Sequence, residues 1–415
     1  MDLVIRQSCP SCGAPLELHE ADRLIRCSFC EVHSFMVPKG VLRFVLPDHI
    51  PTEILPDDIR YYPYLRFKGN IYYCTAREIG HKIIDTTQCG FTGADLPASL
   101  GLRAQAMTLF PVTGRLQGRF VRKNTQAREI FAKAVRLSHI GREKKSGQFL
   151  HTSFIGETLS IIYFPTYKKD DQWYDGVLGR PLVRQENRSE SVTDTLSFQD
   201  HWVPGFIPSI CPGCGDTLHG EPDSVVLFCR NCLRSYQEDN GRFVSLDWEI
   251  VTTEGNDICY LPFWKLRVEV RGVEMKSFGD LLRLTHQPLV VQRCHDTAPP
   301  TFIVPAFKIR PKTFLRLAGV MTLAQLQIAG QEAAMADQMH PVTLPGTEAE
   351  QAVKAVLAAL TINKRKVLPL YPGITIRTQK RSLLYLPFRD QGHDLLHRET
   401  GASLVSSVLR FGRRL

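Results

Sequence analysis

Two four-cysteine frames with the same internal spacing constrain this chain more than any other feature of its sequence. In each frame, two C-x2-C pairs are separated by fourteen residues. The frames consist of Cys9, Cys12, Cys27 and Cys30 in the first half and Cys211, Cys214, Cys229 and Cys232 in the second. Such paired motifs are typical of four-thiolate zinc sites. Because four thiolates complete a tetrahedron and leave no position for a substrate, the frames predict two structural Zn2+ ions.

The residues around the cysteines suit tight metal-binding turns. Pro10 and Pro212 stiffen the turns, and Gly13 and Gly215 follow where a side chain would crowd the chain. The C-P-x-C-G…C-x-x-C form resembles the zinc ribbon superfamily, including bacterial proteins that carry a ribbon ahead of a β-rich body. The resemblance covers about forty residues of each half. It implies a metal-binding ribbon fold but no particular activity, since such ribbons serve transcription, translation, replication and scaffolding.

The internal repeat continues beyond the cysteines. Four further features recur in the same order, namely 61–69 with 260–268, 107–112 with 301–307, 125–137 with 347–360, and 159–165 with 381–388. We interpret this order as a tandem duplication of one ancestral unit. The alignment predicts that three proline pairs occupy equivalent places, Pro63 with Pro262, Pro111 with Pro305, and Pro165 with Pro387.

The repeat predicts an α+β fold by tandem duplication, in which each half is a small four-cysteine zinc ribbon followed by an antiparallel β-rich body with a packed helix. The expected domains are zinc ribbon 1 over 1–45, β-rich body 1 over 46–185, a linker over 186–205, zinc ribbon 2 over 206–250 and β-rich body 2 over 251–415. The linker is placed where the stretch 184–199 is polar and poor in apolar residues.

Helical periodicity marks the packed helices. Apolar residues recur at helical spacing over 347–360, and Thr347 with Glu350 predicts a capping box at the start of that helix. The stretch 125–137 has an equivalent apolar face, and 312–326 predicts a further helix that the first half matches poorly.

Composition is that of an ordinary globular protein, with 43% hydrophobic and 22% charged residues. No apolar run reaches the roughly eighteen residues of a membrane-spanning helix, and no secretory signal is visible. The four cysteines outside the frames, Cys74, Cys89, Cys259 and Cys294, form no spaced pair. We therefore expect a cytoplasmic protein with reduced thiols.

Aromatic residues in the repeated Y-x-P motif allow two interpretations. The residues are Tyr62, Tyr64, Phe67, Tyr260, Phe263 and Trp264. They could stack nucleic-acid bases on an exposed sheet face. Aromatic residues that alternate along a strand are more commonly buried on one face, and no glycine-flanked RNA-binding signature is present, so we expect them in the core.

Basic clusters occur after both predicted helices, at Arg142, Lys144 and Lys145 in the first half and at Lys364, Arg365 and Lys366 in the second. The formal net charge is +9, and eight thiolates with two Zn2+ ions would lower it to about +5. This mild excess permits contact with nucleic acid or an anionic membrane surface without requiring either. The alternative is that these clusters are solvated loops.

Catalytic motifs are weak in this sequence. Cys294, His295 and Asp296 carry nucleophile chemistry, but neighbours in an extended chain point to opposite faces. His393 and His397 lack the glutamate of a metalloprotease helix and lie in an expected hairpin. Phosphate-loop, dinucleotide and hydrolase-elbow motifs are missing. We therefore expect no enzyme, and predict a zinc-stabilised adaptor or scaffold for a protein partner in a bacterial assembly; the alternative is a nucleic-acid-binding protein, followed by an enzyme.

Overall fold

The computed structural model describes residues 3–92, 96–125, 149–182, 194–325, 335–336 and 338–413. The chain forms two compact units, each assembled from separate segments. Unit 1 consists of Met1–Lys68, Ile84–Gly141 and Thr158–Pro208, and unit 2 of Gly69–Ile83, Arg142–Glu157 and Ser209–Leu415. Three long strands are divided between the two units, because their residues 69–74, 79–83 and 151–157 belong to unit 2.

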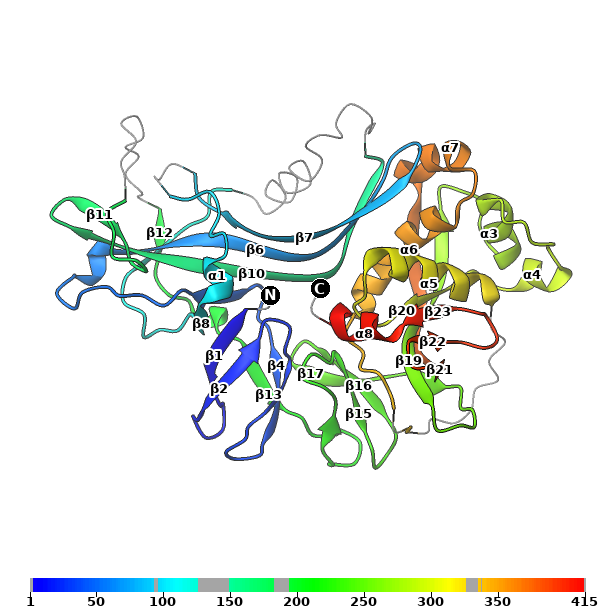
Figure 1. The fold of residues 1–415 in the computed structure, drawn as a ribbon, viewed down its shortest axis with the longest axis horizontal. Coiled ribbons are helices and arrows are strands. Elements are labelled where there is room, and N and C mark those ends of the chain that lie inside the picture. The colour runs from blue at the N-terminus through cyan, green and yellow to red at the C-terminus, as the bar shows by residue number, and fades with distance from the viewer. Residues whose placement is uncertain are drawn as a thin grey trace. The chain divides into compact units, whose positions relative to one another are not determined.

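Unit 1 is built on a 10-stranded sheet with the path β12-β9-β6-β10-β5-β8-β1-β2. In that order the strands are Thr195–Leu196, Arg119–Val121, Ile59–Cys74, His151–Lys169, Leu42–Val45, Thr108–Pro111, Val4–Ser8 and Pro15–His19. Strand β7 (Ile79–Cys89) pairs with β6, and β11 (Gln172–Asp175) with β10. The short helix α1 (Arg103–Ala106) precedes β8 (Figure 1).

The first four-cysteine frame is continuous with this sheet. Strands β1 and β2 flank its first cysteine pair and belong to the large sheet. Strands β3 (Leu24–Arg26) and β4 (His33–Val37) flank the second pair and form a small sheet with β13 (Gly205–Pro208). Of the predicted linker, 186–193 lie outside the described residues, and the rest contains β12, which pairs with β9, and the first residue of β13, which pairs with β4.

Unit 2 contains two sheets. The four-stranded ribbon sheet has the order β14-β15-β16-β17, with strands Leu218–His219, Val226–Cys229, Ser235–Asp239 and Arg242–Leu246. The six-stranded body sheet has the path β20-β19-β21-β22-β23, with β18 also paired to β21. Its strands are β18 (Trp248–Ile250), β19 (Ile258–Arg271), β20 (Thr301–Pro305), β21 (Thr375–Asp390), β22 (Asp394–Leu396) and β23 (Ser403–Val405).

Unit 2 also contains helices, two of which pack on its body sheet. The helices are α3 (Phe278–Thr285), α4 (Arg293–Thr297), α5 (Pro311–Ala324), α6 (Gly346–Leu360), α7 (Lys364–Val367) and α8 (Ser406–Gly412). Helix α5 packs against β20 and α6, and α6 packs against β19, β20 and β21 (Figure 1). Trp264 is fully buried here and donates from Nε1 to the carbonyl of Leu344 at 2.9 Å. None of the described helices is long and apolar enough to cross a membrane.

The mixed α+β class agrees with the sequence, but the bodies are mixed sheets rather than purely antiparallel: β19 pairs antiparallel with β20 and β21, whereas four described pairs are parallel. Strand β5 pairs with β10 in parallel, β1 with β8, β6 with β9, and β18 with β21. Parallel partners are joined by long crossovers, and side-chain alternation is the same in either orientation, so the sequence pattern could not distinguish them.

The predicted helices over 312–326 and 347–360 correspond to α5 and α6, whereas the predicted capping box is wrong. Helix α6 starts at Gly346 after Pro345, and no side chain caps it. Thr347 therefore lies inside the first turn rather than ahead of it. Glu348 instead accepts a hydrogen bond from the amide of Gly156 at 2.5 Å, which joins the helix start to the end of β10. The stretch 126–148, which holds nearly all of the other predicted helix, lies outside the described residues.

Backbone hydrogen bonds recur at matching places in the two halves. The amide of Leu46, after β5, donates to Tyr163 on β10 at 3.1 Å. The amide of Val251, after β18, donates to Tyr385 on β21 at 3.0 Å. Both tyrosines lie two residues before a proline of the predicted pair at 165 and 387.

A second recurring group surrounds the prolines of β6 and β19. Gly90 donates to the carbonyl of Pro63 at 2.8 Å, and Ala306 donates to that of Pro262 at 3.0 Å. The carbonyls of Gly90 and Ala306 each accept hydrogen bonds from two consecutive amides. These are the amides of 124 and 125 for Gly90 and of 343 and 344 for Ala306.

This geometry corrects the predicted match of Pro111 with Pro305. Pro111 lies opposite Phe44 of β5, whereas Pro305 lies opposite Phe263 of β19. The strand that takes the place of β20 beside β6 is β7. Strand β7 is partly exposed and polar, whereas β20 is buried and apolar, so the two strands are not similar in sequence. The sequence analysis instead aligned β20 with β8 because both contain a proline.

Candidate metal centres

The eight predicted cysteines form two compact groups of four. Within each group, the four sulfur atoms lie within 4.8 Å of one another. In the first, Sγ of Cys9 is 3.8 Å from that of Cys30. In the second, Sγ of Cys214 is 3.4 Å from that of Cys229. Ligands about 2.3 Å from a tetrahedral metal would lie about 3.8 Å apart, so both groups fit four-sulfur coordination.

Each group is shaped by two turns that aim sulfurs at a common point. In the first turn of ribbon 1, Cys9 donates its amide to the carbonyl of Ala14 at 2.8 Å, and Gly13 donates to that of Cys9 at 3.0 Å. Gly13 has φ +76°, a left-handed conformation that glycine adopts without strain. Ribbon 2 repeats the turn, with Gly215 donating to Cys211 at 2.9 Å and φ +81°.

Local electrostatics favour a cation between the sulfurs. A hydrogen bond from the amide of Cys12 lowers the pKa of Cys9 to about 6. Burial opposes ionisation of Cys211, but the hydroxyl of Tyr236 at 3.4 Å and nearby amides lower its pKa to about 6. At Cys229, burial and the sulfurs of neighbouring cysteines raise the pKa to about 12. Four thiolates therefore cannot ionise together unless a metal ion compensates their charge.

The two groups have the same exposure pattern. The first and third cysteines are buried, the second is exposed, and the fourth is intermediate. The sulfurs thus lie just below the ribbon surface, with backbone amides directed at them: Phe29 donates to Cys27 Sγ at 3.4 Å, and Gly213 donates to Cys211 Sγ at 3.4 Å. Either group could hold a metal ion closed off from substrate by its four ligands.

The repeated aromatic residues lie in the cores, as expected. Each of Tyr62, Tyr64, Phe67, Tyr260, Phe263 and Trp264 is at most 7% exposed. They are therefore not available to stack on bases. Burial of this kind contributes roughly 1.5–3 kcal/mol for each large apolar side chain.

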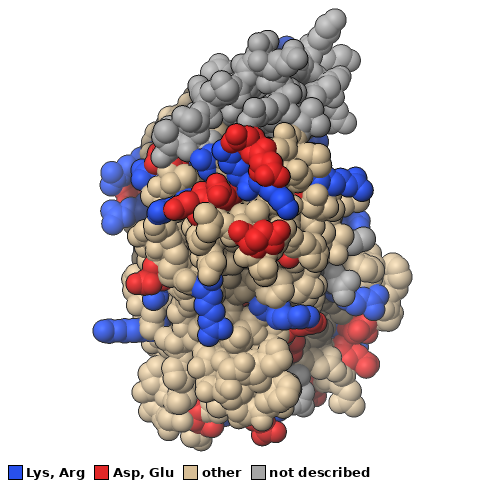
Figure 2. Space-filling model, turned by 90° about the vertical axis from the view of Figure 1, so that its left-hand side faces the viewer, with Lys and Arg blue, Asp and Glu red and all other residues tan. Residues whose placement is uncertain are grey.

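The second basic cluster lies on a short helix, where Arg365 and Lys366 are exposed and Lys364 is partly buried, while the first lies outside the described residues. Lys364, Arg365 and Lys366 form most of α7, with Ile362 exposed just before it. Arg142, Lys144 and Lys145 fall within 126–148. On the face shown in Figure 2, Lys and Arg side chains are interspersed with Asp and Glu rather than forming one basic surface.

The structure does not assemble the histidine and cysteine candidates into a site. Residues 294–296 lie on helix α4, so the expectation of an extended chain was wrong. The carboxylate of Asp296 binds Arg283 at 2.7 Å. His397 is buried with its Nδ1 2.9 Å from Thr400 Oγ1, whereas His393 is exposed. Among the described residues, only the two cysteine groups bring three or more metal-ligating side chains together.

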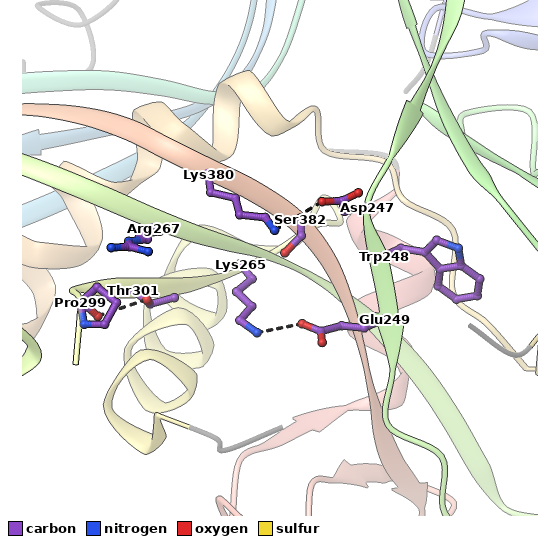
Figure 3. A pocket seen from close by; sticks show the side chains of 9 residues that line it. All are labelled: Asp247, Trp248, Glu249, Lys265, Arg267, Pro299, Thr301, Lys380 and Ser382. Atoms are coloured by element: carbon purple, nitrogen blue, oxygen red, sulfur yellow. Dashed lines mark hydrogen bonds and ion pairs between the residues drawn. The ribbon is translucent and has the colours of Figure 1, made fainter. Parts of the chain in front are cut away.

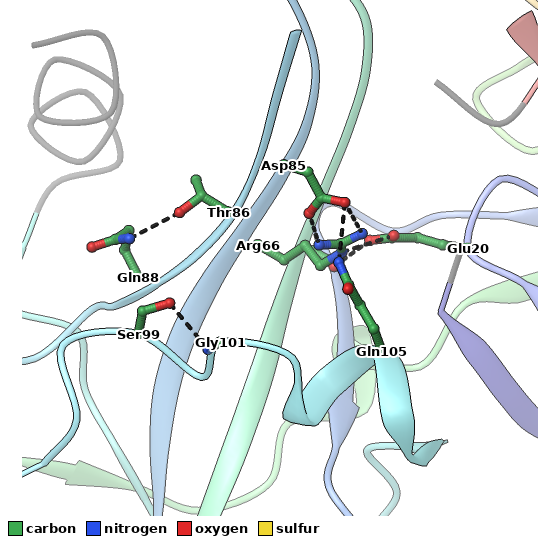
Figure 4. A network of polar contacts seen from close by, with 9 residues as sticks. Glu20, Arg66, Asp85, Thr86, Gln88, Ser99, Gly101 and Gln105 are labelled. Carbon is green, nitrogen blue, oxygen red and sulfur yellow. Dashed lines mark hydrogen bonds and ion pairs between the residues drawn. The ribbon is translucent and has the colours of Figure 1, made fainter. Parts of the chain in front are cut away.

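A buried ionic network in unit 1 was missed by the sequence analysis (Figure 4). Arg66 on β6 is 1% exposed and donates from Nε to Glu20 at 3.0 Å and from Nη1 to Asp85. Ser160 on β10 donates to Glu20 at 2.8 Å, and Gln105 of α1 donates to Asp85 at 3.1 Å. Burial disfavours the charged guanidinium, but the two carboxylates outweigh it and raise the pKa of Arg66. The signal available was a charged residue in the middle of a strand rich in aromatic residues.

Comparison with known proteins adds no family. No protein family, curated protein or solved structure matches the chain. The geometry of the two four-cysteine groups is consistent with zinc ribbons, and the interpretation of both groups as metal centres rests on this geometry alone.

Proposed function

We propose that this chain is a non-catalytic, zinc-stabilised adaptor, built by tandem duplication, that mediates protein–protein contacts in a larger cytoplasmic assembly of bacteria. The observation that carries the proposal is the recurrence of one four-cysteine frame and one set of sheet hydrogen bonds in both halves.

Zinc is the metal that this ligand set favours. Thiolates are soft ligands, and a tetrahedral set of four is typical of structural zinc. Because such a site has no open coordination position, its metal supplies folding energy rather than chemistry. The proposed role of both ions is thus to hold the ribbons in shape.

Duplication is supported by hydrogen bonds that involve side chains as well as backbone. Asn124 Oδ1 accepts from the amide of Thr92 at 2.9 Å, and Thr343 Oγ1 accepts from the amide of Lys308 at 2.9 Å. In both halves the accepting residue is the first of the two residues whose amides share one carbonyl. Two related modules would present two similar faces, which suits one pseudo-symmetric partner or two copies of a partner.

A protein partner is favoured over nucleic acid because the repeated aromatic side chains are buried. The test is to isolate the tagged chain from its own cells at low salt, with and without nuclease treatment. An adaptor remains in a protein complex of fixed stoichiometry after nuclease. Release of the chain as a free monomer by nuclease would overturn the proposal.

Nucleic-acid binding remains the second candidate because α7 carries three consecutive basic residues, of which Arg365 and Lys366 are exposed. Changing Lys364, Arg365 and Lys366 together to Glu leaves an adaptor complex largely intact, since exposed rim charges mainly affect association rate. For a nucleic-acid-binding protein, the same change weakens binding to all sequences and reduces the salt dependence by up to about three units of slope. A matched Gln triple variant separates loss of charge from charge reversal.

A further inference from the structure

A pocket of about 370 Å3 lies on the body sheet of unit 2 (Figure 3). Strand β19 contributes Lys265 and Arg267, and β21 contributes Lys380. Because side chains alternate along a strand, Lys265 and Arg267 lie on the face opposite Trp264 and Leu266, which pack in the core. The volume falls in the range of about 300–1,000 Å3 that is common for ligand sites.

Two carboxylates account for two of the three cations. Glu249 binds Lys265 with an O–N distance of 2.8 Å, and Asp247 lies 3.5 Å from Lys380. Within the described part of the chain, no carboxylate lies within ion-pair distance of Arg267, which is exposed. The pocket therefore has one positive charge in excess.

The same place in unit 1 is closed by the ionic network around Arg66. Arg66 lies three residues after Pro63, as Lys265 lies three residues after Pro262. The next strand matches too: Ser382 lies opposite Lys265 on β21 and two residues before Leu384. In unit 1, Ile162 is the counterpart of Leu384, because Ile162 pairs with β5 and Leu384 pairs with β18. Ser160 lies two residues before Ile162 and therefore corresponds to Ser382.

The two sites differ on the strand beside β6 and β19. Asp85 lies five residues before Gly90 on the strand beside β6, and Thr301 lies five residues before Ala306 on the strand beside β19. Asp85 binds Arg66 directly. Thr301, at the corresponding position, is neutral and lines the pocket. Unit 1 thus carries a carboxylate on this strand, where the strand beside the unit 2 pocket has a neutral residue.

We propose that the unit 2 pocket binds a carboxylate carried by an acidic side chain of a partner protein. This rests on the proposed adaptor function and assigns it a contact site. In unit 1 the corresponding anion is itself a side chain carried on a strand, which favours a protein-borne carboxylate.

The charge of the pocket also favours a carboxylate over a phosphate. One monoanion balances the single excess cation, whereas a dianionic phosphate would face Asp247 and Glu249 without enough positive charge. The planar guanidinium of Arg267 can bind both oxygens of a carboxylate. Hydroxyls of Thr301 and Ser382 provide further hydrogen-bonding groups at the wall.

The test is a titration of the purified full chain, followed by amide shifts in NMR. The probes are the capped peptides Ac-Gly-Glu-Gly-NH2 and Ac-Gly-Gln-Gly-NH2, with acetate and inorganic phosphate as small anions. We expect the Glu peptide to bind in the millimolar range and to shift signals of β19 and β20. The Gln peptide and phosphate should bind at least about tenfold more weakly.

Two variants connect binding to this pocket. Thr301→Asp places the missing carboxylate in the site and should weaken binding of the Glu peptide at least about tenfold, while the neutral Thr301→Asn stays within about twofold. Arg267→Gln should also lose about tenfold, and this variant decides the matter if Thr301→Asp does not fold.

Three results would overturn the proposal: equal binding of the Gln peptide, tighter binding of phosphate, or unchanged binding in both Thr301→Asp and Arg267→Gln. If acetate binds as tightly as the Glu peptide, the ligand is a free small carboxylate and not a side chain of a partner protein. The titration tests the pocket alone, because it contains no partner protein, and a negative titration does not contradict the adaptor function. The nuclease experiment tests the adaptor function alone, and release of the chain in that experiment does not contradict binding of a carboxylate in the pocket.

Discussion

Replacing Arg66 by Met should destabilise unit 1 far more than the corresponding change destabilises unit 2. Arg66 and Glu20 have side chains that are 1% and 4% exposed. Removing the guanidinium leaves the carboxylate of Glu20 buried, and among the residues that the structure describes it then keeps Ser160 as its hydrogen-bond donor but has no cation. Breaking a buried pair in this way costs about 3–5 kcal/mol.

The matched control is Lys265→Met, at the corresponding position of β19. Its pair with Glu249 has side chains that are 35% and 21% exposed. Water can solvate Glu249 when the lysine is lost, so the cost should be about 0.2–1 kcal/mol. At about 2–4 °C for each kcal/mol, Arg66→Met should lower the melting temperature of unit 1 by about 6–20 °C, against about 4 °C or less for the control.

Urea unfolding followed by hydrogen exchange and mass spectrometry measures both effects and assigns each transition to its unit. Adding Glu20→Gln to Arg66→Met should recover part of the loss, because the buried charge is then removed. Equal losses for Arg66→Met and Lys265→Met, or no recovery in the double variant, would refute the reasoning.

The other predictions concern both metal centres, one titrating group and one buried aromatic residue. Cys27→Ser should unfold ribbon 1 and lower the metal content to one per chain without affecting ribbon 2; Cys229→Ser should do the reverse, as elemental analysis and ribbon-specific hydrogen exchange will show. Burial, followed by a nearby arginine, lowers the pKa of His340 from 6.5 to about 4, so its contribution to stability is complete above pH 6.5 and is lost as the pH falls toward 4. Between pH 7 and pH 5, the native chain should lose about 2 kcal/mol more than His340→Gln in urea titrations, and equal losses would contradict this. Trp264→Phe leaves the carbonyl of Leu344 without its donor and should cost about 1–3 kcal/mol in the same titration, whereas a loss below 0.5 kcal/mol would contradict the assigned hydrogen bond.

The sequence predicted the two four-cysteine groups because each depends on local spacing. A C-x2-C pair forms within one turn, so four cysteines and the glycine after the second were enough to identify each group. The buried aromatic residues and helix α6 were likewise visible as strand alternation and helical periodicity.

Features that depend on register between distant strands could not be predicted in this way. Arg66 meets Glu20 and Asp85 only after three separate segments have paired. The correspondence of β7 with β20 is defined by hydrogen bonds to Pro63 and Pro262, and the residue types of the two strands conceal it. The pocket beside Lys265 was missed for the same reason, since its residues come from four stretches of the chain.

The most direct test of the central claim is a zinc measurement on the purified full chain, by elemental analysis together with X-ray absorption. Both four-cysteine groups have sulfur positions that fit a tetrahedral metal. We predict two zinc ions per chain, each with four sulfur ligands at about 2.3 Å. One zinc or none per chain, or nitrogen or oxygen in the first coordination shell, would contradict the claim.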